Sequence, residues 1–120
     1  MADAFLLGVL REHLVLLSAP GSEAGLDMAH WPSCVGGYAC RIPSFNQLGL
    51  GWSGPAIRFG DDTYFDALAR FFDLTPAEAD YLFGNHPDAT GFDCITTFVE
   101  AAFRIDDILE GKFNAYDQTA

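Results

Sequence analysis

Five of the six Cys and His residues of this chain, the residue types that bind zinc, could form one site. Zinc is held by thiolate and imidazole groups when about four of them converge in space. Structural zinc sites usually carry a C-x-x-C pair, and this chain has no such pair. We therefore expect no metal and no other cofactor, and a small metal- or thiol-dependent protein is the alternative interpretation. The residues of that alternative site are His30, Cys34, Cys40, His86 and Cys94.

The same residues could form a thiol enzyme, in which a cysteine attacks the substrate and His30 or His86 serves as its base. A chain with three cysteines and three histidines offers many such combinations. No local signature of a cysteine nucleophile or of a serine nucleophile elbow accompanies them. The sequence favours a protein without catalytic activity.

The segment from Gly49 to Gly54 matches the dinucleotide-binding pattern G-x-G-x-x-G. That pattern binds a pyrophosphate only where a helix begins directly after the glycines. Pro55 and Gly60 leave no room for such a helix, and no β-α-β unit surrounds the segment. We predict a glycine-rich turn.

Negative charge is concentrated in the second half of the chain. Residues 61–120 hold thirteen Asp and Glu against three Lys and Arg, a local net charge of −10, whereas residues 1–60 sum to −1. Such a field repels nucleic acid and anionic lipid and attracts basic proteins. We expect a basic protein surface as partner, without direct nucleic-acid or membrane binding; the alternative is that the charge only confers solubility. The predicted contact element is a helix over 93–110, with the binding residues Asp93, Glu100, Arg104, Asp106, Asp107 and Glu110.

This charge pattern suggests a non-enzymatic protein-binding module. Its sharpest form is a phage-type inhibitor that occupies a basic nucleic-acid-binding surface as a substitute for phosphate. The mean hydropathy is +0.14 although the net charge is −11, so apolar surface is left over for contact. A homo-oligomeric structural protein is therefore the second alternative.

The 120 residues fit one domain, 1–120, and half of them are apolar, so a folded core is expected. We see neither a positively charged leader nor the roughly 18 uncharged apolar residues of a spanning helix. Three cysteines, an odd number, fit a reducing compartment better than a disulfide framework. The sequence predicts a cytoplasmic protein.

The expected fold is mainly α, a single compact domain of four or five helices. Residues 48–59 are predicted as either a small β-hairpin or a long loop. Thr75 to Glu78 reads as a capping box, with Pro76 at the first helical position. The predicted helices cover 4–18, 33–41 with Ser33 as cap, a stretch from Asp62, 75–84, and 93–110 with Asp93 as cap. The predicted core is Phe5, Leu10, Leu14, Trp31, Leu68, Phe71, Phe72, Leu82, Phe83, Phe98, Phe103 and Ile105.

Two blocks of the sequence resemble a loose group of small, uncharacterised bacterial and phage proteins. The first is Trp31 followed by Cys34-Val-Gly-Gly-Tyr-Ala39, and the second is the block from Ala67 to Phe83. The chain lacks the Cys-Gly-Thr that precedes the first block in that group, and it has Phe72-Asp73 where Leu-Gly is usual. The resemblance implies a compact, mainly helical domain and implies no activity or substrate.

Overall fold

The fold is mainly helical, with a small antiparallel sheet. A computed structural model describes residues 3–19, 25–26, 34–54, 56–83, 95 and 97–111. Within these ranges there are six helices, one more than the upper end of the expectation. No helix among them is long and apolar enough to cross a membrane. The elements are α1 (Ala4–Leu17), α2 (Val35–Ala39), α3 (Pro43–Gln47), β1 (Leu50–Ser53), β2 (Ala56–Phe59), β3 (Asp62–Thr63), α4 (Tyr64–Phe72), α5 (Pro76–Phe83) and α7 (Phe98–Leu109).

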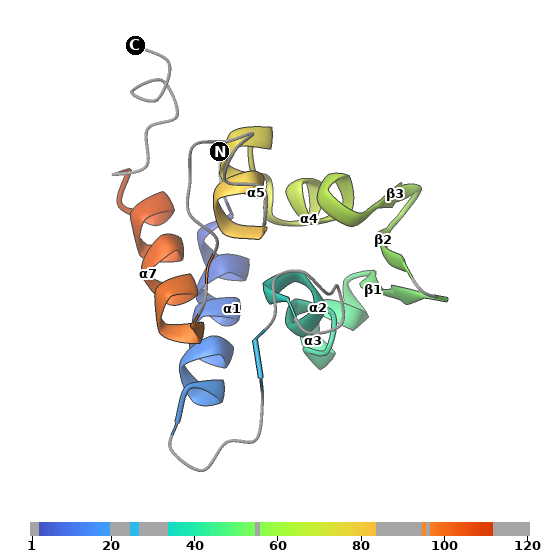
Figure 1. The fold of residues 1–120 in the computed structure, drawn as a ribbon. Coiled ribbons are helices and arrows are strands. Elements are labelled where there is room, and N and C mark those ends of the chain that lie inside the picture. Colours follow the sequence, from blue (N-terminus) through green and yellow to red (C-terminus); the bar gives the residue numbers. More distant parts are fainter. Residues whose placement is uncertain are drawn as a thin grey trace.

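Helices α1 and α7 lie side by side and form a layer on one side of the molecule (Figure 1). Helix α4 packs against α5 and the sheet, and α5 also contacts α7. The short helices α2 and α3 lie between the α1–α7 layer and the sheet (Figure 1). Elements from the two ends of the sequence therefore form one layer, and the middle of the chain lies on one side of it (Figure 1).

Aromatic rings fill much of the core. Phe45 and Phe72 are fully buried, and Phe71 is nearly so. The ring of Phe71 meets those of Phe45, Phe59 and Phe72 edge to face, with centroids 5.0 to 5.3 Å apart. This geometry places the positive edge of one ring against the negative face of the next, which adds to the stabilisation from burial. The remaining predicted core residues that the structure buries are Leu10, Leu14, Leu68, Leu82, Phe83, Phe98 and Ile105.

Two predicted core residues are not in the core, and a third, Trp31, lies outside the described residues. Phe5 on α1 is 76% exposed and Phe103 on α7 is 60% exposed, so both predictions were wrong. Apolar residues surround most of α1, but only the side with Leu7, Leu10 and Leu14 is buried. The other described elements pack against one side of the α1–α7 layer, and these two rings lie on the opposite side.

The expected hairpin is present and extends by one short strand. Strands β1 and β2 pair antiparallel, with Leu50 opposite Phe59, and β3 pairs with the far edge of β2. Helix α3, which was not predicted, precedes the hairpin and begins at Pro43. Proline is favoured at the first helical position because no amide hydrogen is needed there.

The helix ends follow local capping, in part at unexpected residues. The capping box of α5 is confirmed: Glu78 N–H donates to Thr75 Oγ1 at 3.2 Å, and Thr75 N–H donates to Glu78 Oε1 at 2.9 Å. The N-cap of α7 is Thr97 rather than Asp93, and its Oγ1 accepts from Glu100 N–H at 3.0 Å. The N-cap of α2 is Cys34 rather than Ser33. A second Thr-x-x-Glu start was therefore present in the sequence and overlooked.

Candidate functional site

The predicted contact residues of α7 do not form one outward row. Arg104 is only 8% exposed, which corrects its expected place on the outer side of the helix. Its Nη1 donates to the Tyr81 carbonyl at 2.6 Å, and its guanidinium lies 4.7 Å from the centroid of the Tyr81 ring. A cation over an aromatic ring can remain charged while partly desolvated. Arg104 joins α7 to α5 and is not available to a partner.

Asp107 lies on the same side of α7 as Arg104 and also joins it to α5. The Tyr81 hydroxyl donates to Asp107 Oδ2 at 2.8 Å. Burial and this hydrogen bond to a carboxylate raise the pKa of Tyr81 to about 12. Two of the predicted contact residues therefore stabilise the fold.

Asp106 pairs across the seam between α1 and α7. Arg11 Nε donates to Asp106 Oδ1 at 2.6 Å and Arg11 Nη2 donates to Oδ2 at 3.0 Å, a bidentate pair. The carboxylate, through its hydrogen bond and its charge, raises the pKa of Arg11. The two side chains are 38% and 31% exposed, so the pair lies at the surface and its charges largely cancel there.

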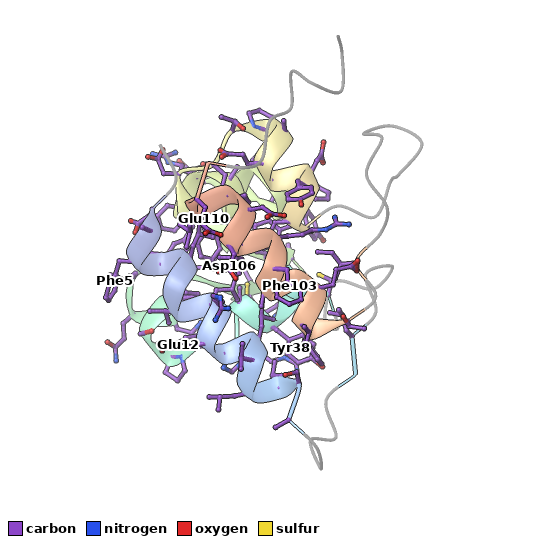
Figure 2. The ribbon with its side chains drawn as sticks, turned by 90° about the vertical axis from the view of Figure 1, so that its left-hand side faces the viewer. Phe5, Glu12, Tyr38, Phe103, Asp106 and Glu110 are labelled. Carbon is purple, nitrogen blue, oxygen red and sulfur yellow. The ribbon has the colours of Figure 1, made fainter. Side chains whose placement is uncertain are left out.

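The outer side of the α1–α7 layer combines apolar side chains with carboxylates. Helical spacing places Phe5, Glu12 and Leu16 on one side of α1. It places Val99, Phe103, Asp106 and Glu110 on one side of α7. In Figure 2, which looks onto both helices, Phe5 lies at one edge, Phe103 lies on α7, and Asp106 is between them. We call this surface the α1–α7 face and define it by Phe5, Arg11, Glu12, Leu16, Val99, Phe103, Asp106 and Glu110.

Two further predicted contact residues are not included in the α1–α7 face. Glu100 is partly buried in the first turn of α7. Asp93 lies outside the described residues. The exposed apolar residues of the face were not predicted as contact residues, because Phe5 and Phe103 were expected in the core.

The alternative metal site is only partly described. His30, His86 and Cys94 lie outside the described residues, whereas Cys34 and Cys40 are buried at the two ends of α2. A rise of 1.5 Å per residue separates their backbones by roughly 9 Å, too far for a disulfide. Within the ranges that the structure describes, no group of three or more His, Cys, Asp or Glu could hold a metal ion.

Cys40 is also poorly suited to nucleophilic chemistry. Burial, with a smaller contribution from Cys34, raises the pKa of the Cys40 thiol to about 12. The thiolate is the reactive form, so this thiol is almost entirely protonated at neutral pH. Cys34 instead caps α2, since its Sγ accepts from Gly37 N–H at 3.3 Å.

The glycine-rich segment is part of the hairpin. Gly49 precedes β1, Gly51 lies within β1, and Gly54 follows it at a φ of 61°. Strand β2 begins at Ala56, so no helix follows the glycines as the dinucleotide pattern requires. The prediction of a turn agrees with this arrangement.

A scan against protein-family models, a search of curated proteins and a search of solved structures each found no match to this chain. The resemblance to the group of bacterial and phage proteins therefore stays a prediction. The candidate site rests on the geometry of the described residues.

Proposed function

We propose that this protein is a non-enzymatic protein-binding module that uses the α1–α7 face to dock onto a basic surface of another protein. One observation supports this proposal above the others. Phe5 is 76% exposed, Leu16 72% and Phe103 60%, and helical spacing places all three on the α1–α7 face. Single exposed apolar residues are common, but several on one face, interspersed with carboxylates, are typical of an interaction surface.

The apolar residues supply the free energy of such a contact. Burying a Leu or Phe side chain contributes about 1.5–3 kcal/mol. Three such side chains at the centre of an interface therefore exceed the contribution of exposed ion pairs, which is typically below about 1 kcal/mol each. Phe5, Leu16 and Phe103 are the residues on which binding should depend most.

The carboxylates determine the kind of partner. Glu12 and Glu110 are exposed on the face, and Asp106 is paired with Arg11. The whole chain carries a net charge of −11, so the long-range field favours a cationic surface. Electrostatic complementarity of this kind increases the association rate and makes it sensitive to salt. The partner surface should present apolar contacts surrounded by Lys and Arg.

The sharper form of the proposal is inhibition. A basic protein surface with this composition commonly binds nucleic acid, and the carboxylates of the face would compete with phosphate for it. Binding of the module and of duplex DNA to one basic protein would then be mutually exclusive. Failure of such competition, with binding intact, would remove the inhibitor form and retain the protein-binding module.

The proposal can be tested with a fluorescently labelled amphipathic helical peptide that carries Leu on one side and Arg on the other. Fluorescence anisotropy should show binding to the full chain that weakens with added salt. Replacing Phe5 and Phe103 with Ser should weaken binding by at least about tenfold, because both rings lose their contacts. Circular dichroism should show an unchanged fold, since both side chains are exposed.

A matched pair of charge variants locates the contact. Two double variants each remove two negative charges: Glu12→Gln with Glu110→Gln on the face, and Asp61→Asn with Asp66→Asn in the turn before β3 and in α4. The first pair should slow association more than the second. Equal effects would mean that only net charge matters and would contradict a specific face. Self-association of the free protein that the Phe5 and Phe103 replacements abolish would instead assign the face to a homo-oligomer.

A further inference from the structure

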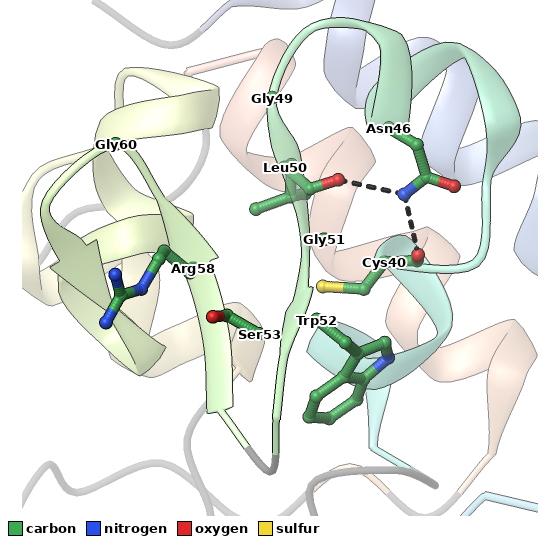
Figure 3. A pocket seen from close by; sticks show the side chains of 9 residues that line it. All are labelled: Cys40, Asn46, Gly49, Leu50, Gly51, Trp52, Ser53, Arg58 and Gly60. Atoms are coloured by element: carbon green, nitrogen blue, oxygen red, sulfur yellow. Dashed lines mark hydrogen bonds between the residues drawn. The ribbon is translucent and has the colours of Figure 1, made fainter.

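A hollow of about 590 Å³ lies at the hairpin, away from the α1–α7 face. Its size falls within the range of small-molecule sites. The register explains why it exists: Gly51 on β1 is paired with Arg58 on β2, so the position beside the arginine has no side chain. Figure 3 shows the hollow and the residues that line it. They are Cys40, Asn46, Gly49, Leu50, Gly51, Trp52, Ser53, Arg58 and Gly60.

The wall of the hollow is held by a side-chain amide. Asn46 Nδ2 donates to the carbonyls of Cys40 and Leu50, both at 2.9 Å, and so fixes α3 against the outer edge of β1 (Figure 3). The same nitrogen lies 3.4 Å from the position of a Cβ on Gly51. Any larger side chain at Gly51 would therefore extend into the hollow or displace Asn46. The hollow depends on glycine at this position.

Arg58 supplies the charge. Four of the arginines have partners: Arg11 binds Asp106, Arg70 binds Asp62, and Arg104 and Arg41 lie over tyrosine rings. No ion pair or side-chain hydrogen bond connects Arg58 to any other residue within the described ranges, although the chain holds seventeen Asp and Glu. An arginine with no carboxylate partner among the described residues of so acidic a protein is available to a ligand anion.

The charge of the surrounding segment favours the same interpretation. Residues 34–60 contain Arg41 and Arg58 and no Asp or Glu, and all nine lining residues belong to this segment. The acidic half begins directly after it, at Asp61 and Asp62, and Asp62 is paired with Arg70. The hollow is thus the acid-free, cationic part of a protein with a net charge of −11.

We propose that this hollow binds a small organic anion, a carboxylate or a phosphate ester. The guanidinium of Arg58 matches both anions with two parallel N–H donors. Ser53 lies on the same face of the hairpin as Arg58, and its hydroxyl offers a further donor. Leu50 is fully buried and Trp52 lies on the opposite face, so neither side chain is assigned a contact with the anion. Cys40 contributes shape and no chemistry, since its thiol stays protonated. The assigned role is binding, without a reaction step.

The test is a titration of the full ¹⁵N-labelled protein with phenyl phosphate, benzoate and neutral benzyl alcohol, followed by NMR. We expect the two anions to shift the Arg58 Nε–H signal and the amides of Gly49, Gly51 and Gly60, and benzyl alcohol to bind at least about tenfold more weakly. Tighter binding of phenyl phosphate would identify phosphate esters as the ligand class, and tighter binding of benzoate would identify carboxylates. Absence of shifts at the solubility limit of both anions would overturn the proposal.

Two variants connect binding to the hollow. Arg58→Gln should weaken binding of the anions by about tenfold or more, whereas Arg41→Gln, which removes the same charge outside the hollow, should change it little. Gly51→Val should block binding by filling the hollow, and valine is favoured in strands. The result for Arg58→Gln decides the matter if Gly51→Val disturbs the fold. Equal effects of the two arginine variants, or benzyl alcohol binding as tightly as the anions, would show that no anion site exists.

Discussion

The α1–α7 face and the hairpin hollow leave different groups exposed. On the face, the cation is satisfied and the rings are not: Arg11 binds Asp106, while Phe5 and Phe103 project from the fold. At the hollow, the cation is not satisfied: Arg58 has no carboxylate partner among the described residues, and no phenylalanine lines the hollow. The two surfaces also differ in shape, because the face is formed by two adjacent antiparallel helices, whereas the hollow exists where glycine leaves a position without a side chain.

The comparison shows how two surfaces of one small domain can suit different ligands. Exposed rings on a broad layer fit a macromolecule that can cover them. A concave, cationic site with a few polar groups fits a small anion. The two proposals are independent, because no residue belongs to both the face and the hollow.

The largest expected effect is a difference in stability between replacing a phenylalanine of the core and replacing one of the α1–α7 face. Phe71→Ala should lower the free energy of unfolding by about 3–5 kcal/mol, because the ring is buried among three others. Phe103→Ala should change it by less than about 1 kcal/mol, because the ring is 60% exposed. Urea unfolding followed by circular dichroism measures both values. A loss at Phe103 as large as that at Phe71 would mean that the α1–α7 face is part of the core.

A smaller effect should separate two glycines of the hollow. Gly49 has a φ of 105° and a Cβ there would lie 3.5 Å from the Phe59 ring, so Gly49→Ala should cost about 1–2 kcal/mol. Gly51 is not at positive φ, and the Cβ of Gly51→Ala would meet only the Asn46 amide nitrogen, at 3.4 Å, so its cost should be below about 1 kcal/mol. Thermal unfolding compares the two variants. The reverse order would contradict the register that places Gly51 beside Arg58.

The smallest expected effect concerns pH and the region around α1. Burial lowers the pKa of His13 from its ordinary value of 6.5, even though the protein is strongly acidic. The unfolded chain therefore binds a proton more readily at this residue, so the contribution of His13 to stability is complete above pH 6.5 and is lost as pH falls through the lower folded value. Stability of the wild type should decrease more between pH 7 and pH 5 than that of His13→Gln. A steeper decrease in the variant would show that the negative field outweighs burial at α1.

Features that depend on neighbours in the sequence could be predicted, whereas features that depend on tertiary packing could not. The amphipathic pattern of α4 and the Thr75–Glu78 capping box depend on neighbours within four residues, and both were predicted correctly. The burial of Arg104 depends on Tyr81, which is 23 residues away. The exposure of Phe5 and Phe103 depends on which side of a two-helix layer the rest of the chain covers, and apolar composition alone does not determine that.

The candidate site shows the same limit. The acidic character of α7 and the glycine-rich segment could both be identified from the sequence, because both are features of composition. The hollow requires the pairing of Gly51 with Arg58, which depends on the register of the hairpin. The absence of acidic residues from 34–60 was the one sequence signal that could have indicated an anion site there.

The seam between α1 and α7 also affects the order in which the chain can fold. The Arg11–Asp106 pair joins residues 95 positions apart, so α1 cannot reach its final place until α7 has left the ribosome. The hairpin, α4 and α5 are joined by contacts much closer in sequence and can assemble earlier. Until α7 arrives, the apolar side of α1 lacks one of the surfaces that bury it. Docking of α1 is therefore expected to be a late step during synthesis, and the interval before it is when α1 is most exposed to aggregation or to chaperones.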